Sequence, residues 1–459
     1  PLSKGGPIMK WKRWSALALC LGLMLAVLLR NHKYFVLHLR NLLHPHLRTI
    51  ARILHIGVPV SIESIFVQVG YMLGNSMAGF AMSLFVLDYT QSPLYYAIYM
   101  FLYTLPQIAA PVLAGPLMDR FSRRRTIYML DFASTAIYAL LAGLMYFGLF
   151  SFWAFASITF IIGTIHSAYT VAFESFYPML VSEGNYIKAY SVLSTLETLV
   201  LVMIPVSTFL YKTVGMVWLM LINSACFCTA AIFETQISDV EGKNGQSGSK
   251  YTFGGYMEDM KEGMRYLWTE KGLLYITLYF IFCFMATGAS NVITLPYFKA
   301  GYADGEYIYM SVWGFMVLGR VLGGMMHYRL HLPEEHKFKI AVFVYVVISA
   351  LEGTYLYLPL ALMRLFCFLQ GVLGVTSYNI RISSTQSYVP DDRKGRFNGT
   401  FLMLTTVGSL LGQLLAGMLT EIMPMRGVLS LFMGISGASA VIIMGKGRNE
   451  VKPIYNKKQ

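Results

Sequence analysis

"AGPLMDRFSRRR", residues 114–125, stands between two long apolar runs of the sequence. The runs cover about residues 94–115 and 126–148, and each is long enough for a helix to cross a bilayer core, which takes about 20 residues. Between them lie Asp119 and a set of arginines, which the hydrocarbon core disfavours. The segment therefore predicts two membrane-spanning helices joined by a short basic loop.

The composition of the whole chain extends this prediction. Of the 459 residues, 56% are hydrophobic and only 13% are charged, and the mean hydropathy is +0.56. Soluble domains carry about 25% charged residues, so a soluble or disordered protein is excluded. The apolar runs do not alternate with polar residues, which argues against a β-barrel. The net charge of +13 falls in short segments between the runs, so we expect no nucleic-acid partner.

Twelve apolar runs predict an all-α polytopic membrane protein. They cover about residues 57–87, 94–115, 126–148, 152–177, 190–211, 214–233, 272–296, 306–327, 338–357, 360–380, 398–420 and 427–444. A Gly/Ser-rich stretch and an amphipathic segment at 234–271 predict a cytoplasmic linker between six-helix bundles at 57–233 and 272–445. Residues 1–56 are expected to be an N-terminal extension whose hydrophobic helix at 14–30 spans the membrane or lies at its interface, and 446–459 a basic cytoplasmic tail.

An internal repeat supports two related bundles. Gly115 and Gly323 open similar segments 208 residues apart, and Val181 and Val389 lie in similar loops with the same spacing. Parallel repeats of this kind build secondary transporters, whose substrate site lies near the bilayer midplane between the halves.

Basic residues orient the chain. The loops after the second and tenth spans, the latter taken to contain Arg381, Arg393, Lys394 and Arg396, are rich in basic residues, and so is the tail. Such loops lie on the cytoplasmic side of a membrane. We therefore expect both ends of the twelve-span core to be cytoplasmic, in the cell (plasma or inner) membrane.

The loop between the second and third spans resembles the signature loop of the major facilitator superfamily: Gly, three residues, Asp-Arg, then Gly-Arg-Arg, with Ser122 here in place of that last Gly. The stretches "NSMAGFAMSLFVLDY" from Asn75 and "YVPDDRKGRFNG" from Tyr388 resemble its macrolide- and drug-exporter-like branch. The resemblance covers about residues 60–445. It implies a twelve-helix, two-half (6+6) fold, alternating access and solute transport driven by an ion gradient.

A shorter stretch resembles another family. Residues 47–70, "LRTIARILHIGVPVSIESIFVQVG", are similar to a segment of multidrug and toxin extrusion exporters. The similarity suggests a fused or remodelled start of the chain.

The signature loop supplies a candidate gate. At the membrane boundary, the Asp119 carboxylate can pair with an arginine or with the positive end of a helix. Such pairs would close the cytoplasmic side in one state and release it in the other, unless the loop is only a basic anchor. The gating candidates are Gly115, Asp119, Arg120, Arg123 and Arg124.

The equivalent of Asp119 in the second half is His327. Together with His331 and His336 it has a spacing seen in metal sites, but we place these residues in a solvated loop that lacks a supporting carboxylate or cysteine pattern. We expect no metal site there.

Ionisable residues inside spans are costly and are therefore candidates for ion coupling. Glu197 is the deepest, roughly 10 Å into the fifth span at 1.5 Å per residue, and could carry a coupling proton. His166 in the fourth span could also take up a proton or could be a hydrogen-bonded packing residue. Asp131 and Glu174 lie near the cytoplasmic ends of their spans, where pairing with loop arginines is the alternative.

Several polar side chains fall on spans that line the central cavity in the resembled family. Each is a candidate either for substrate contact or for an interhelical hydrogen bond. They are Gln68, Asn75, Asn291, Gln370 and Asn379. Glu352 and Arg364 lie nearer the ends of their spans, where we expect them to reach the interface.

These observations predict a secondary active transporter, a proton-coupled exporter of amphipathic small molecules or drugs. The fifth span keeps Pro205 but lacks the glycines of the Gly-Pro-x-x-Gly-Gly pattern of drug/proton antiporters, so another coupling cation stays open. The alternatives are a nutrient or metabolite importer of the same fold and a non-transporting membrane sensor.

The expected partners follow from this function. They are a small-molecule substrate, a coupling proton or other cation and the lipid bilayer, and we expect a monomer. The sequence has no convergent catalytic set and no phosphate-cradling loop, so we expect neither an enzyme, nor ATP drive, nor a cofactor.

Overall fold

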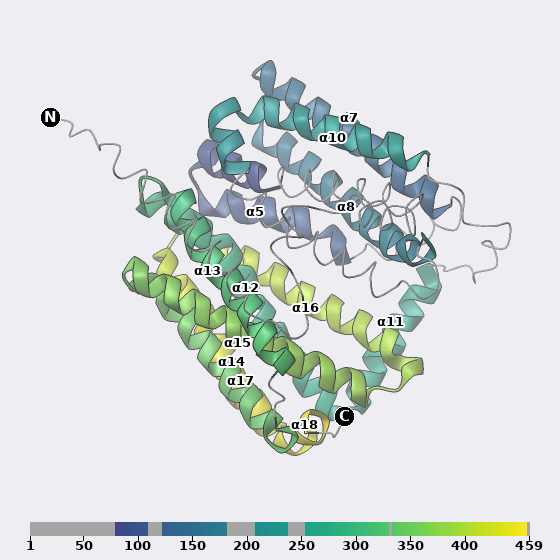
Figure 1. The fold of residues 1–459 in the computed structure, drawn as a ribbon, viewed down its shortest axis with the longest axis vertical. Coiled ribbons are helices and arrows are strands. Elements are labelled where there is room, and N and C mark those ends of the chain that lie inside the picture. Colours follow the sequence, from purple (N-terminus) through teal and green to yellow (C-terminus); the bar gives the residue numbers. More distant parts are fainter. Residues whose placement is uncertain (1–78, 109–121, 181–206, 237–252, 330–332, 457–459) are drawn as a thin grey trace, which may run out of the picture. The chain divides into compact units, whose positions relative to one another are not determined.

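The computed structural model describes residues 79–108, 122–180, 207–236, 253–329 and 333–456, which are helical and contain no strand (Figure 1). Within these ranges, nine helical stretches are long and apolar enough to cross a membrane. Each coincides with one of the predicted spans, which confirms an all-α polytopic membrane protein. Several residues that the sequence singles out lie outside the described ranges: Gln68, Asn75, Gly115, Asp119, Arg120 and Glu197. The predicted N-terminal hydrophobic helix also lies outside them.

A first helix group comprises the helices of residues 79–234. They are the helix Gly79–Thr90, α5 (Pro93–Thr104), α7 (Arg123–Tyr146), α8 (Phe152–Leu180), the helical segment 207–214 and α10 (Met216–Glu234). α7 packs along α10, and α8 packs on α5 and α7. Buried side chains such as Tyr138, Phe155 and Leu219 fill the space between them.

Local sequence sets the helix ends in this group. Pro93 opens α5, where its fixed φ suits the first turn and its missing N–H is not needed. The Ser122 hydroxyl accepts a hydrogen bond from the Arg125 backbone N–H at 3.2 Å and so caps α7. Gly215 separates the helical segment 207–214 from α10. Its φ of 84° is a backbone conformation that favours glycine.

A second helix group comprises the helices of residues 253–455. They are α11 (Phe253–Thr269), α12 (Lys271–Gly301), α13 (Gly305–Arg329), α14 (Lys337–Thr354), α15 (Leu360–Tyr388), α16 (Asp391–Leu419), α17 (Met425–Lys446) and α18 (Arg448–Tyr455). α12 packs along α16, and α13 packs along α15. A Cβ on Gly412 would collide with the main chain of Met285 in the first pair, and one on Gly371 with the main chain of Met316 in the second. Glycine therefore permits both close helix approaches.

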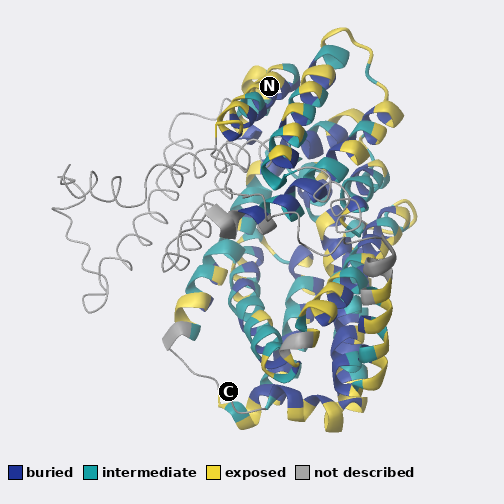
Figure 2. Ribbon diagram, turned by 90° about the vertical axis from the view of Figure 1, so that its right-hand side faces the viewer, coloured by how far each residue is buried: buried dark blue, intermediate teal, exposed yellow. Residues whose placement is uncertain are grey.

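The helix boundaries carry the predicted repeat. The first residues of α8 and α15, Phe152 and Leu360, are 208 residues apart. This is the spacing seen between the similar loops. The outer faces of both helix groups expose large apolar side chains, among them Trp153 and Trp218, which suits contact with lipid (Figure 2).

The structure corrects several sequence-based placements. Arg381 lies inside α15, and Arg393, Lys394 and Arg396 lie inside α16, so they are not loop residues. His327 lies inside α13, and its Nε2 is 2.7 Å from the Thr376 hydroxyl rather than in solvent. The predicted spans are shorter than these helices because each span was limited to apolar residues. A helix continues past the hydrocarbon core at either end.

The predicted basic tail is also more structured than expected. Residues 448–455 form α18, whose Val451, Ile454 and Tyr455 are buried against the second helix group. The Tyr455 hydroxyl lies 3.0 Å from that of Tyr345 in α14. The apolar residues are spaced for one helical face, a signal that the basic charge of the tail obscured.

Candidate functional site

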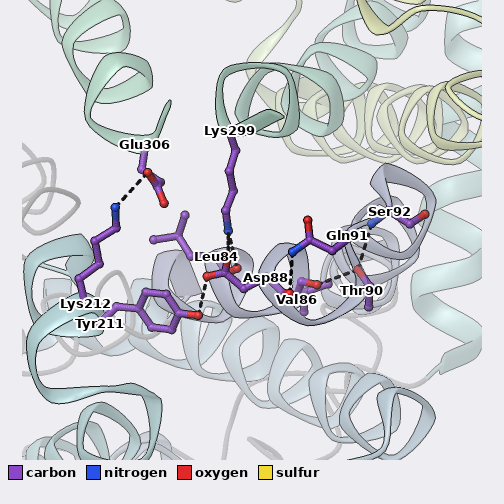
Figure 3. A network of polar contacts seen from close by, with 10 residues as sticks. All are labelled: Leu84, Val86, Asp88, Thr90, Gln91, Ser92, Tyr211, Lys212, Lys299 and Glu306. Carbon is purple, nitrogen blue, oxygen red and sulfur yellow. Dashed lines mark hydrogen bonds and ion pairs between the residues drawn. The ribbon is translucent and has the colours of Figure 1, made fainter. Parts of the chain in front are cut away.

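Five residues at the ends of helices join the two helix groups, and we call them the Asp88 cluster: Asp88, Tyr211, Lys212, Lys299 and Glu306 (Figure 3). Asp88 lies near the end of the helix Gly79–Thr90, and Tyr211 and Lys212 lie in segment 207–214. Lys299 is near the end of α12, and Glu306 is near the start of α13. The sequence predicts the connections at these ends to lie outside the cell.

Two ion pairs cross between the groups in this cluster. Lys299 Nζ lies 2.5 Å from Asp88 Oδ1, and Lys212 Nζ lies 3.2 Å from Glu306 Oε2. The Tyr211 hydroxyl also donates to Asp88 Oδ2 at 2.7 Å. Lys299 and Glu306 are largely buried, with side-chain exposures of 17% and 9%, so their charges are screened less than those of a surface pair.

Further contacts fasten the same end. Lys299 Nζ donates to the Leu84 carbonyl of the first helix at 3.2 Å. The Ser92 hydroxyl donates to Glu421 Oε1 at 3.2 Å just beyond the end of α16. Ion pairs and hydrogen bonds therefore hold the two helix groups together at this end.

A different pair of acids lies within the first helix group. Asp131 in α7 is completely buried, and Glu234 at the end of α10 is 2% exposed. Their carboxyl groups interact with each other, and among the described residues Glu234 is the hydrogen-bond partner of Asp131. The Tyr169 hydroxyl of α8 donates to Glu234 Oε1 at 3.4 Å.

Arg124 does not pair with Asp131. A loop arginine was the expected alternative partner, yet the guanidinium of Arg124 instead donates to the backbone carbonyls of Glu234, at 3.2 Å, and Thr235. Arg124 thus caps the end of α10 rather than neutralising Asp131. The sequence missed Glu234 because it stands at the edge of an apolar run, where an acid usually faces water.

A third polar contact lies within the second helix group. The Gln370 amide of α15 donates to Glu352 Oε2 of α14 at 2.5 Å, which fixes Gln370 in an interhelical hydrogen bond. Glu352 therefore turns inward and does not reach the interface as expected. Arg364 likewise donates to the Ser311 hydroxyl of α13 at 3.0 Å instead of extending to the membrane surface.

The remaining predicted residues lie apart from these contacts. His166 is half-buried in α8 and stacks on Tyr103, with ring centroids 5.9 Å apart. Asn291 in α12 is exposed, and Asn379 in α15 is half-buried. Glu174 lies in α8, but its side chain is outside the described part of the structure.

The sequence matches the model of the Major Facilitator Superfamily over residues 64–351. The chain belongs to the major facilitator superfamily. Membership confirms the family that the signature loop suggested and makes the chain a multi-pass membrane protein of a transporter family.

Relatives within the superfamily are distant. An uncharacterized MFS-type transporter of Bacillus subtilis (strain 168), YkuC, is 24% identical over 291 residues, which make up 58% of this chain and 66% of that protein. The match thus spans just under two thirds of the relative's length.

Solved structures share the superfamily fold. The nucleoside transporter NupG aligns with a TM-score of 0.63 at 13% identity, over 84% of this chain and 97% of that one. A bacterial homologue of the iron transporter ferroportin, in an inward-facing state, aligns with a TM-score of 0.62 at 13% identity, over 87% and 99%. The E. coli fucose:proton symporter FucP aligns with a TM-score of 0.52 at 13% identity, over 84% and 99%. At such identities the likeness concerns the fold and leaves the substrate open.

Proposed function

We propose that this superfamily member is a secondary active transporter that works by alternating access and exports amphipathic small molecules in exchange for protons. The observation that carries the proposal is the Asp88 cluster, whose ion pairs join the two helix groups. For a solute to leave at this end, the Lys299–Asp88 and Lys212–Glu306 pairs must separate. The cluster thus acts as a two-state latch, closed in this structure.

The orientation of the latch rests on loop charge. Basic residues gather at the opposite helix ends, among them Arg123 in α7 and Arg393 in α16, and indicate the cytoplasmic side, so the closed latch faces outside and the structure corresponds to an inward-facing state. The signature loop, which includes Asp119 and Arg120, would close the cytoplasmic end in the other state. The cell membrane is the location that fits this orientation.

Proton coupling is supported by the Asp131–Glu234 pair. Two neighbouring carboxylates repel strongly in a medium of low dielectric constant, so a proton shared between them lowers the electrostatic free energy. Uptake or loss of that proton would change how α7 packs against α10. We therefore add Glu234 to the candidate coupling residues Asp131, His166, Glu174 and Glu197.

Export and proton exchange are testable together in proteoliposomes. An imposed pH gradient should drive a labelled amphipathic compound from the predicted cytoplasmic side to the other side, with protons moving the opposite way. A panel of cationic, neutral and anionic amphipathic drugs supplies the compounds, and a trapped pH-sensitive dye reports the protons. Substrate and protons moving in the same direction would support the importer instead, and flux independent of the gradient would contradict coupling.

The latch has its own test. Replacing Asp88 with Lys and Lys299 with Asp in the same chain should restore transport that either single replacement reduces. If the double variant is no better than the single ones, the pair does not act as a latch.

A further inference from the structure

Arg381 is a positively charged residue inside the second helix group. It belongs neither to the Asp88 cluster nor to the Asp131–Glu234 pair. It lies seven residues before the end of α15, hence roughly 10 Å from that end at 1.5 Å per residue. This end is opposite to the Asp88 cluster, because α15 runs from the predicted outer side to the predicted inner side. The side chain is half-buried.

Three aromatic rings from three helices surround the guanidinium. Its Cζ lies 4.7 Å from the ring centroid of Phe401 in α16, 5.3 Å from that of Phe280 in α12 and 5.6 Å from that of Tyr378 in α15. Phe280 and Phe401 are buried and contact each other edge to face, with centroids 5.8 Å apart. Tyr378 is 55% exposed and marks the open side of this aromatic cradle.

Cation–π contacts fix the position of the charge without using its hydrogen-bond donors. Among the described residues, the Arg381 guanidinium has neither an ion pair nor a hydrogen bond, and the groups that act on its charge are Tyr345, Tyr378, Tyr455 and Cys283. Tyrosine and cysteine are neutral at pH 7. The guanidinium nitrogens of Arg381 are not completely buried, because none of them is a buried atom that lacks a hydrogen-bond partner. Their N–H groups can therefore be reached from outside the protein.

Arginines elsewhere in the group differ in this respect. Arg364 donates to Ser311, and Arg396 pairs with Glu262 at 2.7 Å. Arg381 instead lies over three aromatic rings, and its planar fork of donors has no partner among the described residues. Such a fork matches the two oxygens of a carboxylate or phosphate.

We propose that Arg381, held by Phe280, Tyr378 and Phe401, binds the carboxylate or phosphate of an amphipathic organic anion. The exposed ring of Tyr378 offers an apolar surface to the rest of that ligand. This site would restrict the exported amphipathic compounds to anions. The route by which the ligand reaches Arg381 rests on the proposed function. A lipid headgroup can also carry a phosphate or carboxylate. The experiment must therefore distinguish a bound lipid from a free solute.

Binding to the purified full chain in an uncharged, phosphate-free detergent tests the site without transport. Isothermal titration calorimetry would compare 1-naphthoate and 1-naphthyl phosphate with neutral 1-naphthalenemethanol, which carries the same rings. We expect at least one anion to bind at least about tenfold more tightly than the alcohol, as a charge-assisted bidentate contact allows. Arg381→Gln should remove that preference and leave alcohol binding unchanged.

Arg426→Gln is the matched control. Arg426 also lies over an aromatic ring, Tyr357 at 5.1 Å, but it is exposed and at the opposite end of the group. This variant should keep the preference for anions. Equal affinity of the wild-type chain for anion and alcohol, or an unchanged preference in Arg381→Gln, would overturn the proposal.

Arg381→Lys covers the case in which Arg381→Gln does not fold. Lysine keeps the charge but loses the fork, so the anion should bind several-fold more weakly than to the wild type; unchanged affinity would count against the site. Addition of phosphatidylglycerol identifies the source of the anion: displacement of naphthoate that depends on Arg381 assigns the site to a lipid headgroup, and undisturbed binding assigns it to a solute. Because these measurements need no flux, the anion site can hold even if proton-driven export fails.

Discussion

The Asp88 cluster and the Asp131–Glu234 pair use carboxylates in opposite ways. In the cluster, each acid faces a lysine of the other helix group, and Asp88 remains 42% exposed. In the pair, two acids of the same group face each other in almost complete burial. Attraction between opposite charges favours one arrangement of the helix groups, whereas repulsion between like charges makes the local structure depend on a proton. Under the proposed function, the first arrangement closes one end of the molecule and the second responds to a proton.

The largest effect is expected from neutralising the carboxyl pair. Asp131→Asn or Glu234→Gln removes the site that a shared proton would occupy, so transport driven by a pH gradient should fall by more than about tenfold. Exchange of substrate across proteoliposomes without a gradient should persist, because the helix groups can still move.

Glu352→Gln is the control for that change. It neutralises a buried acid that faces an amide rather than another acid, and it can keep the contact with Gln370. Gradient-driven flux should stay close to that of the wild type. An equal loss of gradient-driven flux in Glu352→Gln and Asp131→Asn would show that Asp131 has no special role in proton coupling.

Reversing a charge in the cluster should have the next largest effect. Lys299→Glu places two acids face to face across the helix groups, and the ratio of closed to open latch should fall by about tenfold, or about 1.4 kcal/mol. Spin labels on cysteines that replace the exposed Tyr89 and Ile422 in a cysteine-free chain would report the separation by electron spin resonance. An unchanged distance distribution would show that other contacts hold this end.

A smaller effect is expected from building a second like-charged pair. Gln370→Glu would face Glu352 with another carboxyl, and one proton could relieve the repulsion. The melting temperature of the purified variant should therefore fall as pH rises from 5 to 8, by roughly 1–2 °C more than that of the wild type, for a cost of about 1–2 kcal/mol. Equal pH dependence in both chains would mean that the site accommodates two charges.

The smallest effect should come from salt. An increase in ionic strength from about 0.1 M to about 1 M shortens the Debye length from about 10 Å to about 3 Å and weakens the partly exposed cluster. The open fraction measured with the same spin labels should rise by less than about threefold. Gradient-driven flux limited by the buried pair should respond less, and a larger response there would indicate that Asp131 is reached by solvent ions.

Several elements of the fold were predictable because a bilayer demands them. Long apolar runs located the nine membrane-length helices of the described residues, and the linker prediction contained α11. The ends were less accurate: the run ending near residue 380 continues as a helix to Tyr388, which moved Arg381 from a loop into α15. Hydropathy reports the width of the hydrocarbon core and not the hydrogen bonding that extends a helix beyond it.

The candidate sites were predicted less well than the spans. Asp131 and Gln370 were singled out by their positions in apolar runs. Their partners Glu234 and Glu352 stand near the ends of such runs, where an acid is expected to face water and is not a candidate for a buried site. Lys212, Lys299 and Asp88 also stand at run ends and gave no signal of their own. Their pairing depends on segments far apart in the sequence that meet only when the helices pack.

The sequence by itself determined that this chain is a multi-span membrane protein of the major facilitator superfamily, because the bilayer imposes helix length and charge placement locally. Only the tertiary structure decided which ionisable groups meet: lysine with acid between the helix groups, acid with acid inside one of them, and Arg381 with three aromatic rings. Electrostatic free energy depends on distance and burial, and neither is fixed until the helices have packed.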